Sequence, residues 1–167
     1  MIARRGQVVA PIEWVSHSSL HTERLGERVG GRARPGDVVA LWGELGTGKT
    51  VLVRGIATGL GLDEDAVASP TFVILHEHHA GRLPLFHLDL YRLDRAGLAS
   101  TGWEECLELG GVTAIEWPDR LGDELPADRL DVRLEHIADT KRRVVLEARG
   151  DRSGKLLEEL RDDLAGA

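Results

Sequence analysis

The feature that most constrains this chain is the glycine-rich segment at residues 43–50, which reads GELGTGKT. It matches the pattern G-x-x-x-x-G-K-[ST] at every position. Glycines allow the backbone to turn so tightly that successive N–H groups face one oxyanion, and the N-terminus of a following helix adds partial positive charge. The segment therefore predicts a phosphate-binding loop, called the P-loop below, between a strand and a helix.

The flanking sequence fits that placement. Residues 38–42 (VVALW) form a continuous apolar run typical of a strand buried on both faces, and Leu52, Ile56 and Leu60 recur at helical spacing after the loop. A glycine-rich turn that is only a turn does not explain a Lys-Thr pair at this point. We therefore predict that a nucleoside triphosphate is bound by Gly43, Glu44, Leu45, Gly46, Thr47, Gly48, Lys49 and Thr50. In this prediction Lys49 supplies a cation for the β- and γ-phosphates, and Thr50 presents its hydroxyl to Mg²⁺.

The rest of the chain alternates strand-like and helix-like segments without a linker or a repeat. A helix is expected from Ser18 or Ser19 to Ala33, where Leu25 and Val29 share a face. Further strands are expected at 72–76, 83–90, 112–115, 130–134 and 143–148, and further helices at 94–109 and 156–164. This order predicts an α/β P-loop nucleotide-binding fold, with a mixed, largely parallel sheet flanked by helices on both faces. We expect one domain over residues 1–167.

Two carboxylates at strand ends are candidates for the chemistry that follows binding. Asp89 ends the apolar stretch at 85–88, where it could reach Mg²⁺ as a Walker-B aspartate does, and Glu116 ends the apolar stretch at 112–115. Hydrolysis needs such a group to hold the metal or to orient the attacking water. The alternative for each is a solvated strand terminus. His87, beside Asp89, is interpreted as an ordinary residue of the sheet rim.

Two further residues, Thr71 and Trp117, could contact a bound nucleotide. Thr71 lies in the Ser69-Pro70-Thr71 loop before a strand, where its hydroxyl could sense the γ-phosphate and Mg²⁺, although an ordinary turn is equally consistent. Trp117 directly follows Glu116, and either core packing or contact with the nucleotide explains it. Ser18, Ser19 and Thr22 at the first helix are candidates for contact with the base.

Composition narrows the class of partner. The chain has 21 Lys plus Arg against 28 Asp plus Glu, a formal net charge of −7, which argues against a broad surface for DNA or anionic lipid. No run approaches the roughly 18 apolar residues of a membrane span. The single cysteine, Cys106, fits a reducing compartment, so a cytoplasmic location is expected. The chain contains no asparagine, so the Asn-Lys-x-Asp motif of common P-loop GTPases is missing and ATP is favoured over GTP.

Four motifs, in order, resemble the bacterial TsaE family, formerly called YjeE. They are the P-loop, SPTF at 69–72, HLDLYRL at 87–93 and GVTAIEWP at 111–118, and the resemblance runs from about Leu25 to Leu134. It implies a small cytoplasmic ATPase that assists synthesis of threonylcarbamoyladenosine next to the anticodon of tRNA. The implied partners are the proteins TsaD and TsaB, with tRNA reached only through them.

The resemblance also implies roles for single residues. Thr50 and Glu116 correspond to the magnesium-site residues of the family, Asp89 to its Walker-B aspartate and Thr71 to its switch hydroxyl. Trp117 corresponds to the tryptophan beside the nucleotide. With Lys49, three of these residues form the expected catalytic set: Glu116, Asp89 and Thr71.

Two other functions remain open on the sequence. A small-molecule kinase would use the same loop to pass the γ-phosphoryl group to a hydroxyl acceptor, and would turn over ATP much faster with its metabolite present. A nucleotide-gated binding module would hydrolyse negligibly, so loss of Glu116 would leave its partner binding unchanged.

Overall fold

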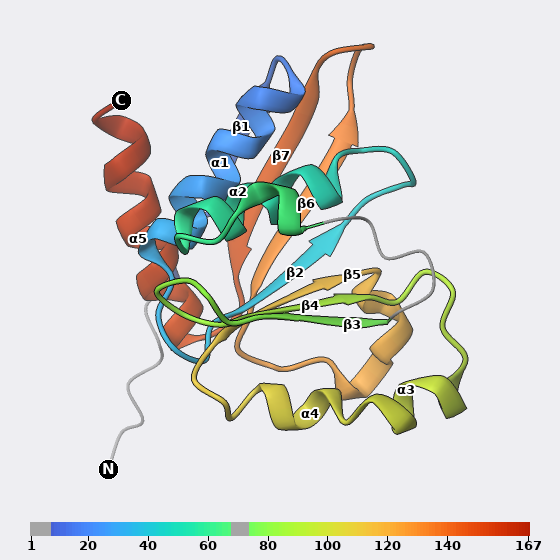
Figure 1. Cartoon of the computed structure of the whole chain (residues 1–167). Coiled ribbons are helices and arrows are strands. Elements are labelled where there is room, and N and C mark those ends of the chain that lie inside the picture. Colours follow the sequence, from blue (N-terminus) through green and yellow to red (C-terminus); the bar gives the residue numbers. More distant parts are fainter. Residues whose placement is uncertain (1–7, 68–73) are drawn as a thin grey trace.

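A seven-stranded sheet forms the centre of the computed structural model, which describes residues 8–67 and 74–167 (Figure 1). The strand order is β1-β7-β6-β2-β5-β4-β3, and the four strands β6, β2, β5 and β4 are parallel to one another. The outer pairings of β1 with β7, β7 with β6 and β3 with β4 are antiparallel. The strand bounds are β1 Ile12–Ser16, β2 Val38–Trp42, β3 Leu75–His78, β4 Leu85–Asp89, β5 Val112–Glu116, β6 Leu130–His136 and β7 Arg142–Ala148. The predicted mixed α/β sheet is confirmed, with its parallel part in the middle.

Helices cover both faces of this sheet, as expected (Figure 1). One face carries α1 (Ser19–Arg32), α2 (Lys49–Gly59) and α5 (Asp151–Ala165). The other carries α3 (Arg95–Thr101), α4 (Trp103–Cys106) and the 3-10 segment η2 (Pro118–Glu124), and a short 3-10 turn η1 (Glu64–Ala66) follows α2. None of the helices in the described ranges is both long and apolar enough to span a bilayer.

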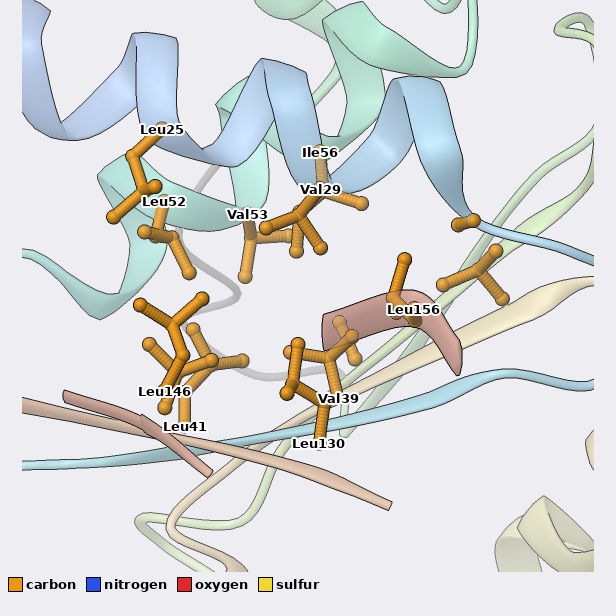
Figure 2. Close-up of a cluster of buried hydrophobic side chains, with 14 of the residues drawn as sticks. Leu25, Val29, Val39, Leu41, Leu52, Val53, Ile56, Leu130, Leu146 and Leu156 are labelled. Atoms are coloured by element: carbon orange, nitrogen blue, oxygen red, sulfur yellow. The ribbon is translucent and has the colours of Figure 1, made fainter. Parts of the chain in front are cut away.

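The larger core lies between the sheet and the first group of helices. Figure 2 shows Leu25 and Val29 of α1 and Leu52 and Ile56 of α2 pointing toward side chains of the sheet, among them Leu41. Because the two positions in each helix are four residues apart, about one turn, each helix turns one apolar stripe inward. The P-loop precedes α2 directly, so this core also fixes the position of the loop.

Helices α1 and α2 pack unusually closely because glycines line their contact. A Cβ atom on Gly26 would lie 2.2 Å from the carbonyl oxygen of Leu52, and one on Gly55 would lie 1.9 Å from that of Glu23. Such distances are far inside van der Waals contact, so only glycine fits without a shift of the backbone. The glycine-lined contact therefore sets how near α2 lies to α1.

Some predicted bounds were wrong. The single helix expected at 94–109 is two short helices, because Gly102 adopts a left-handed conformation with φ of 63° and ends α3. The strand expected at 72–76 is described from Leu75 and continues to His78, while residues 72 and 73 lie outside the described ranges. The terminal helix begins at Asp151, five residues earlier than the leucine spacing indicated, because Ser153 and Asp128 cap its first turn.

Candidate nucleotide-binding site

The P-loop lies where the carboxyl ends of three parallel strands meet. Strand β2 leads into it, and β5 and β4 are the next two strands of the sheet, with Leu41 paired to Glu116 and Glu116 paired to Asp89. In α/β sheets of this kind, ligands bind outside the carboxyl ends of the strands. The register alone therefore brings both predicted carboxylates to the predicted phosphate loop.

Three glycines give the loop its shape. Gly43, Gly46 and Gly48 have φ values of 152°, 80° and 104°, which side chains rarely tolerate. Gly48 is the N-cap of α2, so the first N–H groups of that helix have no partner within it. Glu44 and Leu45 are exposed at the tip of the loop. The result is an open turn of backbone donors of the kind that binds an anion.

Lys49 is buried beneath this turn. Its ammonium donates hydrogen bonds to the carbonyl oxygens of Gly43, at 2.6 Å, and Glu44, at 2.9 Å, and lies 4.1 Å from the ring centroid of Trp117. Burial lowers the pKa of Lys49, and the nearby carboxylates of Glu116 and Asp89 oppose that shift. The cation is thus held at the loop by contacts that phosphate oxygens could replace.

Thr50 and Glu116 are joined across the mouth of the loop. The Thr50 hydroxyl donates to Glu116 Oε1 at 2.9 Å, and His87 Nε2 lies 2.6 Å from Glu116 Oε2. Glu116 is only 2% exposed. A carboxylate this well buried and bonded on both oxygens is not a solvated strand terminus, so that alternative is wrong for Glu116.

Asp89 lies beside Glu116 and is half-buried at the end of β4. Burial raises the pKa of its carboxyl, the N–H of Tyr91 lowers it through a hydrogen bond at 3.1 Å, and the neighbouring charge of Glu116 raises it again. The charges of Glu116 and Asp89 also act on Lys49, because both raise its pKa, and the charge of Lys49 in turn lowers the pKa of Asp89. The structure brings together the carboxylates that the sequence placed 27 positions apart.

Trp117 is held in a strained conformation between Lys49 and Tyr91. It is the one residue other than glycine with positive φ in the described ranges, at 60°, and its ring lies 4.9 Å from that of Tyr91. A left-handed conformation costs a residue with a side chain roughly 1–3 kcal/mol and is found preferentially at functional sites. The position of Trp117 over the loop lysine fits its predicted place beside a nucleotide.

The residues suspected at the first helix lie on the other side of the loop, although the Thr22 hydroxyl is itself hydrogen-bonded to Ser16 at 2.6 Å. Ser18, Ser19 and Thr22 line a cavity of about 260 Å³ together with the P-loop and Thr140. Ser18 caps α1 by accepting from the N–H of His21, which fixes this wall of the cavity. The cavity is a pocket of suitable chemistry for a polar heterocycle attached to a bound phosphate chain.

A sequence profile described as "Threonylcarbamoyl adenosine biosynthesis protein TsaE" matches residues 16–144. The chain belongs to the TsaE family. The tRNA threonylcarbamoyladenosine biosynthesis protein TsaE of Bacillus subtilis is 36% identical over 149 residues, which cover 89% of this chain and 93% of that protein. The protein of the same name from Treponema pallidum is 41% identical over 133 residues, which cover 79% and 97% of the two chains. The predicted family is therefore confirmed.

A solved structure agrees with this TsaE assignment. The crystal structure of Bacillus subtilis YdiB superposes with a TM-score of 0.79 and 32% sequence identity, covering 94% of this chain and 98% of that one. At this likeness the arrangement of strands and helices in the present TsaE chain is that of the solved structure.

The oxygen atoms at the mouth of the loop are suitable ligands for a magnesium ion that is bound to a nucleotide. Mg²⁺ prefers oxygen ligands, keeps several waters and is usually held by one or two carboxylates together with phosphates. The oxygens of Thr50, Glu116 and Asp89 meet this preference. Within residues 8–67 and 74–167, no three His, Cys, Asp or Glu side chains are gathered to hold a metal by themselves. A magnesium ion here would draw its remaining ligands from phosphate and water.

Sequence reasoning missed two contacts of the site. His87 is fully buried against Glu116 and is not a rim residue, and Arg142 Nε donates to the carbonyl oxygen of Thr47 in the P-loop at 3.1 Å. A histidine inside an otherwise apolar strand was a signal for the first. The second had none, because Arg142 comes from β7, more than ninety positions along the chain. Thr71 lies outside the described residues, so its predicted role stays a prediction.

Proposed function

We propose that this member of the TsaE family binds ATP with Mg²⁺, hydrolyses it slowly, and uses the cycle to assist threonylcarbamoyladenosine formation on tRNA in the cytoplasm. The observation that carries the proposal is the convergence of a buried lysine, a hydroxyl and two carboxylates at the P-loop. The names of the family and of its relatives supply the pathway.

The residues of the loop suit each part of an ATP molecule. Backbone N–H groups at the start of α2 and the helix dipole would bind the β-phosphate. Lys49 would exchange its two carbonyl partners for phosphate oxygens, and the cavity beside Ser18 and Thr22 would take adenine. Trp117 would remain against the phosphate end of the nucleotide.

Thr50, Glu116 and Asp89 would hold the metal ion. When bound, Mg²⁺ neutralises charge that develops on the phosphate oxygens. Glu116 would fix the Thr50 hydroxyl, which donates to its Oε1, and the less buried Asp89 would orient an attacking water. In this proposal the hydroxyl of Thr71 senses whether the γ-phosphate is present.

We further propose that the nucleotide controls docking onto a complex of TsaD and TsaB. The net charge of −7 makes the chain itself a poor binder of tRNA, so tRNA would be reached through those partners. Hydrolysis would then reset the assembly between turnovers, and ATP would not activate the substrate.

The proposed function is tested by comparing hydrolysis and capture in one set of variants. Glu116→Gln should lower the ATPase rate with TsaD and TsaB present by about tenfold or more, because the amide cannot hold the metal as a carboxylate does. Glu158→Gln, an exposed change on α5, is the control and should leave the rate unchanged. Wild-type protein should co-purify with TsaD and TsaB more strongly with ATP than without nucleotide.

Other outcomes would replace parts of this proposal. Equal capture in every nucleotide state would refute nucleotide-controlled docking. A normal ATPase rate in Glu116→Gln would remove Glu116 from the hydrolytic machinery. Strong acceleration by one small hydroxylated metabolite would favour the kinase instead.

A further inference from the structure

His87 is the most deeply buried titratable residue near the site, and binding and hydrolysis as described above do not use it. It is 0% exposed and stands in β4 between Phe86 and Leu88, both fully buried. A buried polar group is costly unless it is hydrogen-bonded, and an apolar side chain would fill the same space without that cost. A buried imidazole at this position is therefore expected to have a hydrogen-bond partner.

That partner is Glu116. His87 Nε2 lies 2.6 Å from Glu116 Oε2, and no other polar contact anchors the ring, since Nδ1 has no hydrogen-bond partner among the described residues. This ring makes its one hydrogen bond to the carboxylate at the P-loop.

The sheet register explains how the two side chains meet. Asp89 is paired with Glu116 and His87 with Ala114, so His87 is the diagonal neighbour of Glu116 on the same face. That face is the one covered by α2, which carries Thr50. Three elements, β4, β5 and α2, thus contribute one member each to a continuous chain from His87 through Glu116 to Thr50.

The direction of the hydrogen bonds follows from the chemistry of the groups. A carboxylate only accepts, so His87 Nε2–H donates to Oε2 and the Thr50 hydroxyl donates to Oε1. Once its proton is directed to Glu116, the Thr50 oxygen keeps its lone pairs for a cation. Without His87, the Glu116 carboxylate could rotate about its last torsion. The Thr50 O–H group would then no longer be held pointing toward Glu116.

We propose that His87 is a positioning residue, which locks the Glu116 carboxylate so that Thr50 presents its oxygen to the magnesium ion of the nucleotide. This inference rests on the proposed function. It predicts that changes at His87 weaken only the part of nucleotide binding that depends on Mg²⁺. Groups that orient metal ligands typically contribute about 10–100-fold to metal affinity.

Two substitutions of the same chemical type separate the hydrogen bond from packing. In His87→Gln the side-chain amide nitrogen can reach the place of Nε2, whereas in His87→Asn it can reach only the place of Nδ1. The measurement is the dissociation constant of a non-hydrolysable ATP analogue, by calorimetry, with Mg²⁺ and with EDTA. His76→Asn is the control, because His76 faces His87 from β3 and is not hydrogen-bonded to a carboxylate.

We expect His87→Asn to lose about tenfold or more of the gain in affinity that Mg²⁺ gives the wild-type protein, with its affinity in EDTA unchanged. His87→Gln should keep that gain, and so should His76→Asn. Unchanged affinity in EDTA also shows that each variant is folded at the loop.

The inference is overturned if His87→Asn keeps the full magnesium-dependent gain, or if His87→Gln loses as much as His87→Asn. Either result would assign His87 to packing while leaving the proposed function intact. Failure of the proposed function gives a different result, because the wild-type protein itself would then show no magnesium-dependent binding.

Discussion

At the scale of single residues, two buried carboxylates, Glu116 and Asp37, differ in how completely they are hydrogen-bonded. Glu116 is buried but has a partner on each oxygen. Asp37, at the entrance to β2, is 3% exposed; its Oδ2 accepts the N–H of Arg34, while Oδ1 has no partner among the described residues. The two carboxylates therefore differ in how well the fold satisfies their charge.

This difference predicts a pH dependence of stability. Burial, the largest effect, raises the pKa of Asp37. A raised carboxyl pKa means that folding favours the protonated form, so the contribution of Asp37 to stability is present at low pH and is lost as pH rises through its folded pKa. Asp37→Asn should therefore raise the melting temperature at pH 7, by a margin that shrinks as the pH is lowered toward the folded pKa of Asp37.

The measurement is thermal unfolding of both proteins at several pH values in EDTA. Asp123→Asn, an exposed change in η2, should shift the melting temperature little at any of them. A variant at Asp37 that is less stable than wild type at pH 7 would show that the charge is stabilising in place.

At the scale of elements, the contact between α1 and α2 connects the core to the site. Gly55 lies in α2 one turn and a half after Thr50, and its Cα faces the backbone of α1 at Glu23. Any side chain there must push the two helices apart. Because Lys49 and Thr50 begin α2, such a shift would be felt at the P-loop.

Gly55→Ala should therefore destabilise the protein by roughly 1–3 kcal/mol through overpacking, although alanine is the better helix former. Nucleotide affinity should fall with it. Gly31→Ala is a matched control on α1, because a Cβ there meets nothing within 4 Å, and it should stabilise by up to about 1 kcal/mol. Chemical denaturation of the two variants and wild type makes the comparison; equal stabilisation by both alanines would contradict the packing described.

At the scale of the whole molecule, the parallel centre of the sheet was predictable and its edges were less so. Buried strands such as 38–42 and 112–115 could be predicted because they are continuous apolar runs. The P-loop motif between β2 and α2 indicated the fold class. At the antiparallel edge, β6 and β7 form a hairpin across residues 137–141, whereas β1 pairs with β7 from more than 120 positions away. No local pattern encodes the pairing of β1 with β7.

The same distinction of scale applies to the site. Each of Lys49, Thr50, Asp89 and Glu116 could be chosen from its own motif, because the ends of parallel strands meet at one edge. The role of His87 could not, because it depends on the diagonal register between β4 and β5 and on the burial of both partners. The break at Gly102 was missed because a single glycine is tolerated in many helices.

The central claim is that the P-loop of this chain binds ATP through Lys49, and calorimetric titration of ATP with Mg²⁺ tests it most directly. Wild-type protein and Lys155→Ala, an exposed change on α5, should bind alike. Lys49→Ala should lose about 100-fold or more, because two charge-assisted hydrogen bonds of roughly 1.5–3 kcal/mol each disappear, while its thermal unfolding remains cooperative. Wild-type affinity in a folded Lys49→Ala protein would contradict the account.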